Sequence, residues 1–287
     1  MTNLKNLVRF NSDSLPIYNR ALQKKHDDDL KARLAPIFGL ITTAYKLYDD
    51  RFQTNRLESI PQQAHFLPYL NDLKSLYSYK NATIRFVKKT IDDLQTFPLG
   101  NTCQNCTINA VNSMDHVLGQ AGFPQYAVHP ANLFPSCTEC NGYKSDSFTR
   151  HGLRRFLNLY SDILPNIQYL FVNIAVDASG DLDYNFVVEN RNGLGGNLFA
   201  LIDNHFRELN LISRMKSASI KPFSELRSSI RARLKDLTWE KISEQVQTET
   251  QENMQNLGTN HFQYVLQRAM MAHPLFQNSF PQVIAPA

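Results

Sequence analysis

The sequence predicts an α+β protein that is mostly α-helical, and three observations support this prediction. Apolar residues recur at helical spacing from Leu15 to Phe97 and again from Leu198 to about Met271. Between these regions, two runs rich in Val, Ile, Phe and Tyr flank a turn-forming segment, which predicts a β-hairpin. All four cysteines lie within residues 103–140, so the middle of the chain is chemically distinct.

The composition is that of an ordinary globular protein. The chain has 287 residues, 43% hydrophobic and 20% charged, which fits one or two domains and excludes a disordered, collagenous or disulfide-dense chain. No apolar run reaches the roughly 18 residues of a membrane helix, and the first residues lack the features of a secretory signal. We therefore expect a cytoplasmic protein with no membrane partner. The net charge of +4 permits nucleic-acid binding without requiring it.

Residues 1–100 are expected to form a helical N-terminal region. The helical pattern is clearest at Leu30, Leu34, Ile37, Ile41, Ala44, Tyr45 and Tyr48. Pro36 falls inside this pattern, so a helix can instead begin there. Two further helices are expected over Pro68–Tyr79 and Ala82–Thr96. The residues Phe97–Asn101, which include Pro98 and Gly100, predict a boundary before a central domain, residues 101–150.

Residues 151–287 are expected to combine a β-hairpin with a helical C-terminal region. The two strands of this hairpin are expected over Gln168–Val176 and Tyr184–Glu189, around a turn at 177–181. Arg150–Leu159, just before them, resembles a short basic helix. The helical pattern after Leu198 predicts breaks near Pro222 and Gly258, and the proline-containing tail from Pro274 is expected to be extended.

The central segment contains two Cys-x2-Cys pairs, Cys103 with Cys106 and Cys137 with Cys140. Disulfides are disfavoured in a reducing compartment, and this spacing is typical of a four-thiolate zinc site. Four thiolates leave no open position for water, so such a zinc ion is structural and a catalytic metal must bind elsewhere. The alternative is a set of reduced, unligated thiols.

Polar residues near the cysteines have the chemistry of metal-assisted phosphodiester hydrolysis. The neutral imidazole of His116 can take a proton from water near pH 7, and the adjacent Asp115 carboxylate can bind a hard cation. The Asn132 amide can orient an imidazole, and Asn141 offers an oxygen to Mg²⁺. The alternative is that these residues have ordinary surface, turn or capping roles.

The second cysteine pair is expected to open a helix. Ser136 and Glu139 match a Ser-x-x-Glu capping box, which predicts a helix start at this point. On that helix, Cys137 and Asn141 are one turn apart, as are Cys140 and Lys144. One short helix can therefore carry zinc ligands and site residues together.

This segment, roughly Thr102–Ser147, resembles the HNH (ββα-metal) endonuclease family in the version with a four-cysteine zinc knuckle. The resemblance implies a β-hairpin bearing Asp115 and His116, a loop bearing Asn132 and a helix bearing Asn141. It implies His116 as the general base, Asp115 as a ligand of a catalytic Mg²⁺ or Mn²⁺, and Asn132 as a residue that orients the loop or the His116 ring. Asn141 stands where the family usually has His, and we expect it to be the second metal ligand.

Basic residues after the motif are expected to contact the substrate. Lys144, Arg150 and Arg154 are candidates for phosphate contacts. The segment Asn204–Lys235 carries eight basic residues against two acidic ones. It is either a path for a phosphate backbone or a solvated helix face.

The expected function is therefore metal-dependent hydrolysis of DNA phosphodiester bonds. The large helical flanks resemble those of effectors in restriction or antiviral defence systems, in which the nuclease acts with an ATPase or sensor subunit. One alternative is a zinc-knuckle module that binds nucleic acid or protein and has lost cleavage. Another is an HNH nuclease that cleaves RNA.

Overall fold

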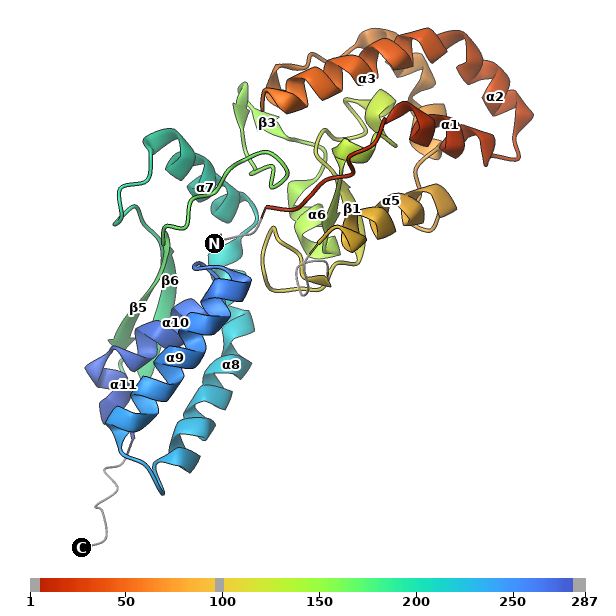
Figure 1. Cartoon of the computed structure of the whole chain (residues 1–287). Helices are drawn as coiled ribbons and strands as arrows, with labels where there is room; N and C mark the ends of the chain where they lie inside the picture. The colour runs from red at the N-terminus through yellow and green to blue at the C-terminus, as the bar shows by residue number, and fades with distance from the viewer. Residues whose placement is uncertain (1–5, 96–100, 281–287) are drawn as a thin grey trace, which may run out of the picture. The chain divides into compact units, whose positions relative to one another are not determined.

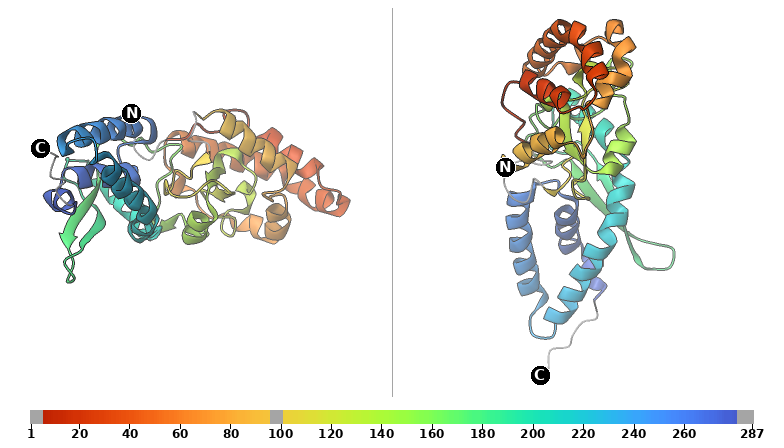
Figure 2. Two further views of the ribbon diagram at one scale, coloured as in Figure 1. Left: turned by 90° about the horizontal axis from the view of Figure 1, so that it is seen from below. Right: turned by 90° about the vertical axis from the view of Figure 1, so that its right-hand side faces the viewer.

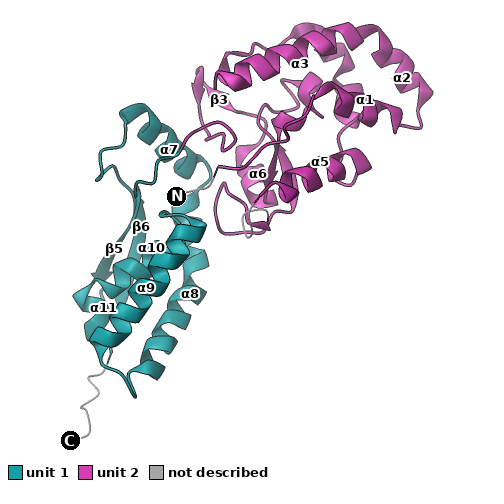
Figure 3. Cartoon of the chain, in the orientation of Figure 1, with its two compact units in different colours: residues 1–5, 164–287 teal, residues 6–163 magenta. Residues whose placement is uncertain are grey.

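A computed structural model describes residues 6–95 and 101–280, and the chain divides into two compact units. The N-terminal unit covers Asn6–Ile163, and the C-terminal unit begins at Leu164 (Figures 1 and 3). The boundary expected at Phe97–Asn101 lies almost entirely outside the described residues. Among the helices of the described chain, none has both the length and the apolar content needed to cross a membrane.

The N-terminal unit is built mainly from short helices. Its helices before the cysteine segment are α1 (Leu15–Gln23), α2 (Asp28–Leu34), η1 (Ala35–Ile37), α3 (Phe38–Gln53), η2 (Leu57–Ser59), η3 (Ala64–Tyr69), α4 (Leu70–Ser75) and α5 (Ala82–Asp93). Asp27 caps α2 by accepting the Leu30 N–H at 2.8 Å, and Asn81 caps α5. Pro36 lies in η1 and separates α2 from α3, which matches the second of the two expectations for this region. The single helix expected over Pro68–Tyr79 is shorter, because Pro68 belongs to η3 and α4 ends at Ser75.

The cysteine segment folds as two antiparallel strands followed by a helix. Strand β1 (Ser113–His116) pairs with β2 (Leu133–Ser136), with Asp115 opposite Phe134 and His116 opposite Leu133. The connection contains η5 (Pro124–Tyr126) and η6 (Pro130–Asn132), and α6 (Thr138–Lys144) follows β2. The strand-loop-strand-helix order therefore has the arrangement expected from the sequence.

The basic helix expected over Arg150–Leu159 is wrong. This segment begins with a small hairpin of β3 (Thr149–Arg150) and β4 (Leu153–Arg154). His151 and Gly152 both have positive φ, 52° and 75°, which is the backbone geometry of a tight two-residue hairpin turn. The His-Gly pair thus determines the local structure.

A buried aromatic cluster joins α3 to the connection between β1 and β2. The Tyr48 hydroxyl donates to the Ala131 carbonyl at 3.1 Å, and the Tyr126 hydroxyl donates to the Ala44 carbonyl at 3.1 Å. The His129 ring packs 4.3 Å from the Tyr48 ring. The helical part of the unit therefore supports the loop that follows β1.

The C-terminal unit packs helices on a long β-hairpin. The expected hairpin is confirmed as β5 (Leu170–Val176) and β6 (Leu182–Val188), with Asn173 opposite Asn185. Its helices are α7 (Gly196–Glu208), α8 (Leu211–Arg233), α9 (Trp239–Leu257), α10 (Phe262–Met271) and α11 (Pro274–Asn278). Helix α10 packs on β5 and α8 on β6, and the tip of the hairpin projects beyond these helices (Figure 2).

Two expectations for the C-terminal helices need correction. The helix does not break at Pro222, which lies inside α8, because Met215, Leu226 and Ile230 bury apolar side chains on both sides of the proline. The segment from Pro274 begins as the short helix α11 rather than as an extended tail. The break at Gly258 is confirmed, since this glycine ends α9 with a φ of 105°.

Candidate functional site

The four cysteines form one buried cluster. Their Sγ atoms all lie within 4.8 Å of one another, and the Cys106 and Cys137 sulfurs are 3.9 Å apart. A tetrahedral zinc site with Zn–S bonds of 2.3 Å has sulfur–sulfur edges of about 3.8 Å. All four residues are free thiols rather than disulfides. The cluster therefore matches the donor set and spacing of a structural Zn²⁺ site.

Backbone N–H groups donate hydrogen bonds to two of the four sulfur atoms, and one of these bonds lies at the start of α6. The Ile108 N–H donates to Cys106 Sγ, and the Cys140 N–H donates to Cys137 Sγ, each at 3.4 Å. The pKa of Cys137 lies below its usual range because the other three thiols hydrogen-bond to it. The capping box expected from Ser136 and Glu139 is wrong, because Cys137 itself is the N-cap and Ser136 ends β2.

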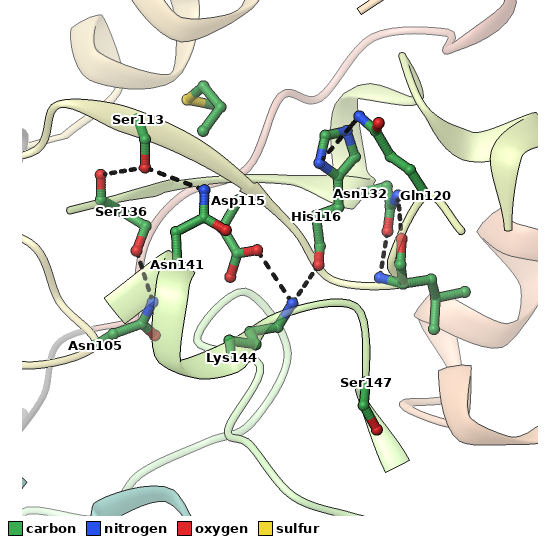
Figure 4. Close-up of polar contacts among 12 residues, drawn as sticks. Asn105, Ser113, Asp115, His116, Gln120, Asn132, Ser136, Asn141, Lys144 and Ser147 are labelled. Carbon is green, nitrogen blue, oxygen red and sulfur yellow. Dashed lines mark hydrogen bonds and ion pairs between the residues drawn. The ribbon is translucent and has the colours of Figure 1, made fainter. Parts of the chain in front are cut away.

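The candidate site residues meet where α6 faces β1 (Figure 4). Lys144 Nζ lies 3.2 Å from Asp115 Oδ1 and also donates to the His116 carbonyl oxygen. One turn earlier on α6, Asn141 Nδ2 lies 3.5 Å from Ser113 Oγ. The structure thus brings Asp115 of β1 together with Asn141 and Lys144 of α6, and the cysteine cluster joins the start of α6 to the segment before β1.

Burial changes the acid–base properties of both strand residues. Burial raises the pKa of Asp115, and the neighbouring Lys144 ammonium opposes this change. Burial also lowers the pKa of His116 to about 4, so its imidazole is neutral at pH 7. A neutral imidazole is the form that can accept a proton.

Two contacts of His116 Nε2 favour opposite protonation states of this atom. The Ala127 carbonyl oxygen, 2.9 Å away, can only accept a hydrogen bond and favours a proton on Nε2. The Gln120 amide nitrogen, 2.7 Å away, can only donate and favours a lone pair there. The Tyr77 ring packs edge-on at 4.5 Å between centroids, which fixes the plane of the imidazole.

Gln120 is a site residue that sequence reasoning missed. Its Nε2 lies 2.7 Å from His116 Nε2 and 3.4 Å from His116 Nδ1, so the amide covers the imidazole (Figure 4). The only sequence signal is its position four residues after His116, in the segment Gly119–Gly122. Nothing in that spacing marks a ring contact, because the loop conformation creates it.

Asn132 fixes the loop rather than the His116 ring. It is fully buried, and its Oδ1 accepts the Leu118 N–H at 2.7 Å and the Tyr48 hydroxyl at 3.3 Å. Its Nδ2 donates to the carbonyls of Leu118 and Tyr126 at 3.1 and 3.0 Å. Of the two roles expected for this residue, the observed contacts match the first.

The arginines expected to contact substrate have different environments. Arg154 pairs with Asp162, with Nη1 2.9 Å from Oδ1, and its side chain is only 12% exposed. Arg150 is exposed on β3. Arg154 therefore has an internal structural partner, whereas Arg150 lies at the surface of the N-terminal unit.

A cavity of about 540 Å³ with a mixed polar and apolar lining lies beside the loop after β1. Its lining includes Leu118, Gly122, Asp146, Ser147 and Glu58. A Cβ on Gly119 would lie 2.3 Å from the Asp146 carbonyl oxygen, so only glycine permits this approach. Ser145, between α6 and Asp146, has φ 50° and ψ −148°, a region that glycine normally occupies. The strained backbone of Ser145, directly after Lys144, thus accompanies the close approach of the segments at Gly119 and Asp146.

Comparisons with known proteins reveal a distant similarity to a phage protein. No protein-family model matches the chain, and no solved structure matches it. Protein ea31 of Escherichia phage lambda is 28% identical over 131 residues, which are 44% of this chain and 44% of ea31. The matched segment thus covers less than half of either protein. The chain is distantly similar to part of this phage protein.

Proposed function

We propose that the chain is a metal-dependent HNH endonuclease that hydrolyses DNA phosphodiester bonds. The observation that carries this proposal is the arrangement of β1, β2 and α6, in which the Asp115 carboxylate and the Asn141 amide lie where α6 faces β1, and the neutral His116 follows Asp115 on the strand. The cysteine cluster beside them supplies the rigidity that such a site needs.

In this proposal, His116 is the general base in the tautomer that carries its proton on Nε2. Its Nδ1 takes a proton from a water molecule, which attacks the scissile phosphorus, and the Nε2–H bond to the Ala127 carbonyl stabilises the imidazolium that forms. The Gln120 amide must move aside for that water to reach Nδ1, because it now covers the ring. Asn132 keeps the loop in register so that the Ala127 carbonyl stays in place.

Asp115 and Asn141 would hold the catalytic cation. Carboxylate and amide oxygens suit the hard ions Mg²⁺ and Mn²⁺. When bound, such an ion stabilises the negative charge that develops on the phosphate and on the leaving oxygen. Lys144 and Arg150 would contact substrate phosphates, and the paired Arg154 would support the surface between them.

We also propose that this nuclease acts in the cytoplasm, as a restriction or antiviral defence effector with a protein partner. The C-terminal unit contains none of the candidate site residues, so it is available for other contacts. The sequence has no glycine-rich phosphate-binding loop, so an ATPase or sensor subunit would supply any nucleotide chemistry. A reducing compartment keeps the four thiolates available for zinc.

A second candidate function is a zinc-knuckle module that binds nucleic acid or protein without cleaving it. The internal contacts of the site favour this alternative, since Lys144 already neutralises Asp115 and Gln120 already covers His116. RNA cleavage is a third candidate, because the same residues can attack either backbone. Cleavage assays on DNA and on RNA, run side by side, distinguish this candidate from DNA cleavage.

Plasmid cleavage tests the proposal. Purified protein is incubated with supercoiled plasmid in Mg²⁺, Mn²⁺ or EDTA, and the wild type is compared with His116→Ala. The exposed His65, changed to Ala, provides a matched control in the same unit. We expect metal-dependent nicking that falls at least about 100-fold in His116→Ala and is unchanged in His65→Ala. Equal nicking by all three folded, zinc-loaded proteins would contradict the proposal.

A further inference from the structure

Lys144 and Asp115 form a buried ion pair at the centre of the candidate site. Their side chains are only 8% and 5% exposed, and Nζ lies 3.2 Å from Oδ1. Lysine is rarely buried without a partner, because removing its charge from water is costly. Here the Asp115 carboxylate and the His116 carbonyl oxygen provide that partner. The ammonium group is therefore the counter-ion of Asp115.

The oxygens that hold this ammonium are also those that suit a divalent cation. Mg²⁺ and Mn²⁺ prefer carboxylate and carbonyl oxygens. Two positive charges a few ångströms apart repel strongly in a site that excludes water. A cation on Asp115 and the Lys144 ammonium in its present position therefore exclude each other.

The position of Lys144 at the end of α6 allows its side chain to move away from Asp115. Lys144 is the last residue of α6, and a lysine side chain has a long, flexible stem. The strained Ser145 backbone that follows restricts the Lys144 backbone, so any displacement of the ammonium occurs through rotation of the Lys144 side chain. A phosphate group near the site would provide an alternative anionic partner for the ammonium.

We propose that Lys144 is a positioning residue that neutralises Asp115 in the free protein and that a divalent cation binds Asp115 by displacing it. The released ammonium then binds a substrate phosphate. This inference rests on the proposed function, because it assumes that Asp115 is a metal ligand. Cation binding releases the Lys144 ammonium for the phosphate, and phosphate binding frees Asp115 for the cation. Each binding event therefore strengthens the other.

Binding of Mn²⁺, measured by electron paramagnetic resonance without nucleic acid, tests the inference. Lys144→Met removes the ammonium and keeps the length of the side chain. Lys74→Met is the matched control, because this lysine also acts electrostatically on the site but forms no ion pair within the described residues. We expect Lys144→Met to bind Mn²⁺ at least tenfold more tightly than the wild type, and Lys74→Met to stay within twofold of it. Asp115→Asn should lose the site.

The outcomes separate this inference from the proposed function. Equal Mn²⁺ affinity in the wild type and Lys144→Met, with loss in Asp115→Asn, would overturn the inference and leave the metal site intact. Absence of an Asp115-dependent Mn²⁺ site from every folded protein would overturn both.

A measurement on the wild-type chain covers the case in which Lys144→Met does not fold. Nitrogen-15 labelling of lysine side chains makes the buried Lys144 ammonium observable by nuclear magnetic resonance, and Lys144→Arg assigns its signal. We expect this signal to shift progressively as Mg²⁺ is added. A signal that stays unchanged at Mg²⁺ concentrations that support cleavage would overturn the inference.

Discussion

The two units use their charged residues in different ways. Residues 6–163 contain 18 Lys and Arg against 14 Asp and Glu, whereas residues 164–280 contain 11 against 12. Among the described residues of the N-terminal unit, Lys144 pairs with Asp115 and Arg154 with Asp162, and none of these side chains is more than 12% exposed. In the C-terminal unit, the ion pairs found among the described residues are exposed or only partly buried, as for Lys216 with Asp183.

This difference shows where a basic segment does and does not indicate a nucleic-acid surface. The basic run of Asn204–Lys235 is neutralised in part by acidic residues from α8 itself and from neighbouring elements, at Lys216 with Asp183, Lys221 with Glu225 and Arg233 with Glu249. The N-terminal unit keeps the positive excess and contains the candidate site. We therefore expect phosphate binding to depend mainly on the N-terminal unit.

Removing the zinc cluster should have the largest effect and should act on one unit only. In Cys140→Ser, we expect loss of bound zinc and unfolding of the N-terminal unit, because structural zinc contributes on the order of 10 kcal/mol to a small domain. The C-terminal unit should keep its own thermal transition. Metal analysis and calorimetry measure both. A zinc-free N-terminal unit with unchanged melting would contradict the account.

Acid should destabilise both units through their buried histidines. Burial lowers the pKa of His116 to about 4 and of His129 to about 3 in the N-terminal unit, and it lowers the pKa of His261 to about 4 in the C-terminal unit. The unfolded chain binds these protons near pH 6.5 and the folded chain does not, so stability is lost as the pH falls from 6.5 towards 4. Each histidine contributes about 1.4 kcal/mol per pH unit in this window. The raised pKa of Asp115 offsets part of the loss.

Unfolding by urea at pH 7.5 and pH 5 checks this prediction, with a probe for each unit. In His261→Gln, the pH dependence of the C-terminal unit should become flatter and that of the N-terminal unit should not change. An unchanged pH dependence of the C-terminal unit in His261→Gln would show that this buried histidine does not control its acid stability.

Two buried asparagines provide a matched pair across the units. Asn132 makes four hydrogen bonds in the N-terminal unit, and Asn260 accepts the N–H groups of Tyr169 and Leu170 in the C-terminal unit. We expect Asn132→Ala and Asn260→Ala each to destabilise their own unit by about 2–3 kcal/mol. Only Asn132→Ala should also lower cleavage. Loss of cleavage in a folded Asn260→Ala protein would place part of the active machinery in the C-terminal unit.

The smallest expected effect concerns two residues with left-handed backbones. Thr107 has a φ of 58°, and its buried hydroxyl has no hydrogen-bond partner within the described residues. Because β-branched residues rarely adopt this conformation, Thr107→Gly should stabilise the N-terminal unit by about 0.5–1 kcal/mol. Asn210, at φ 50° in the C-terminal unit, tolerates it, so Asn210→Gly should be nearly neutral. Urea unfolding compares the two variants.

The sequence predicted features that depend on local pattern. Turn residues at 177–181 placed the β5–β6 hairpin, and the Cys-x2-Cys spacing identified the thiols that form one cluster. It failed where a non-local partner or a short turn decides the structure. A short basic helix was expected over Arg150–Leu159, whereas His151 and Gly152 form a hairpin turn.

The candidate site shows the same limit. Asp115, His116 and Asn141 were selected by motif, and the structure brings them to one region. The Lys144 contact with Asp115 joins residues 29 positions apart, and the Gln120 contact depends on loop conformation. Neither contact follows from residue type or spacing, because each arises only when β1, the loop and α6 are assembled.

Cleavage of supercoiled plasmid in Mg²⁺, by the wild type and by a folded, zinc-loaded His116→Ala protein, tests the central claim most directly. The account predicts metal-dependent nicking by the wild type and a loss of at least about 100-fold in the variant. Nicking at the wild-type rate by His116→Ala would contradict the assignment of His116 as the general base and, with it, the proposed active site.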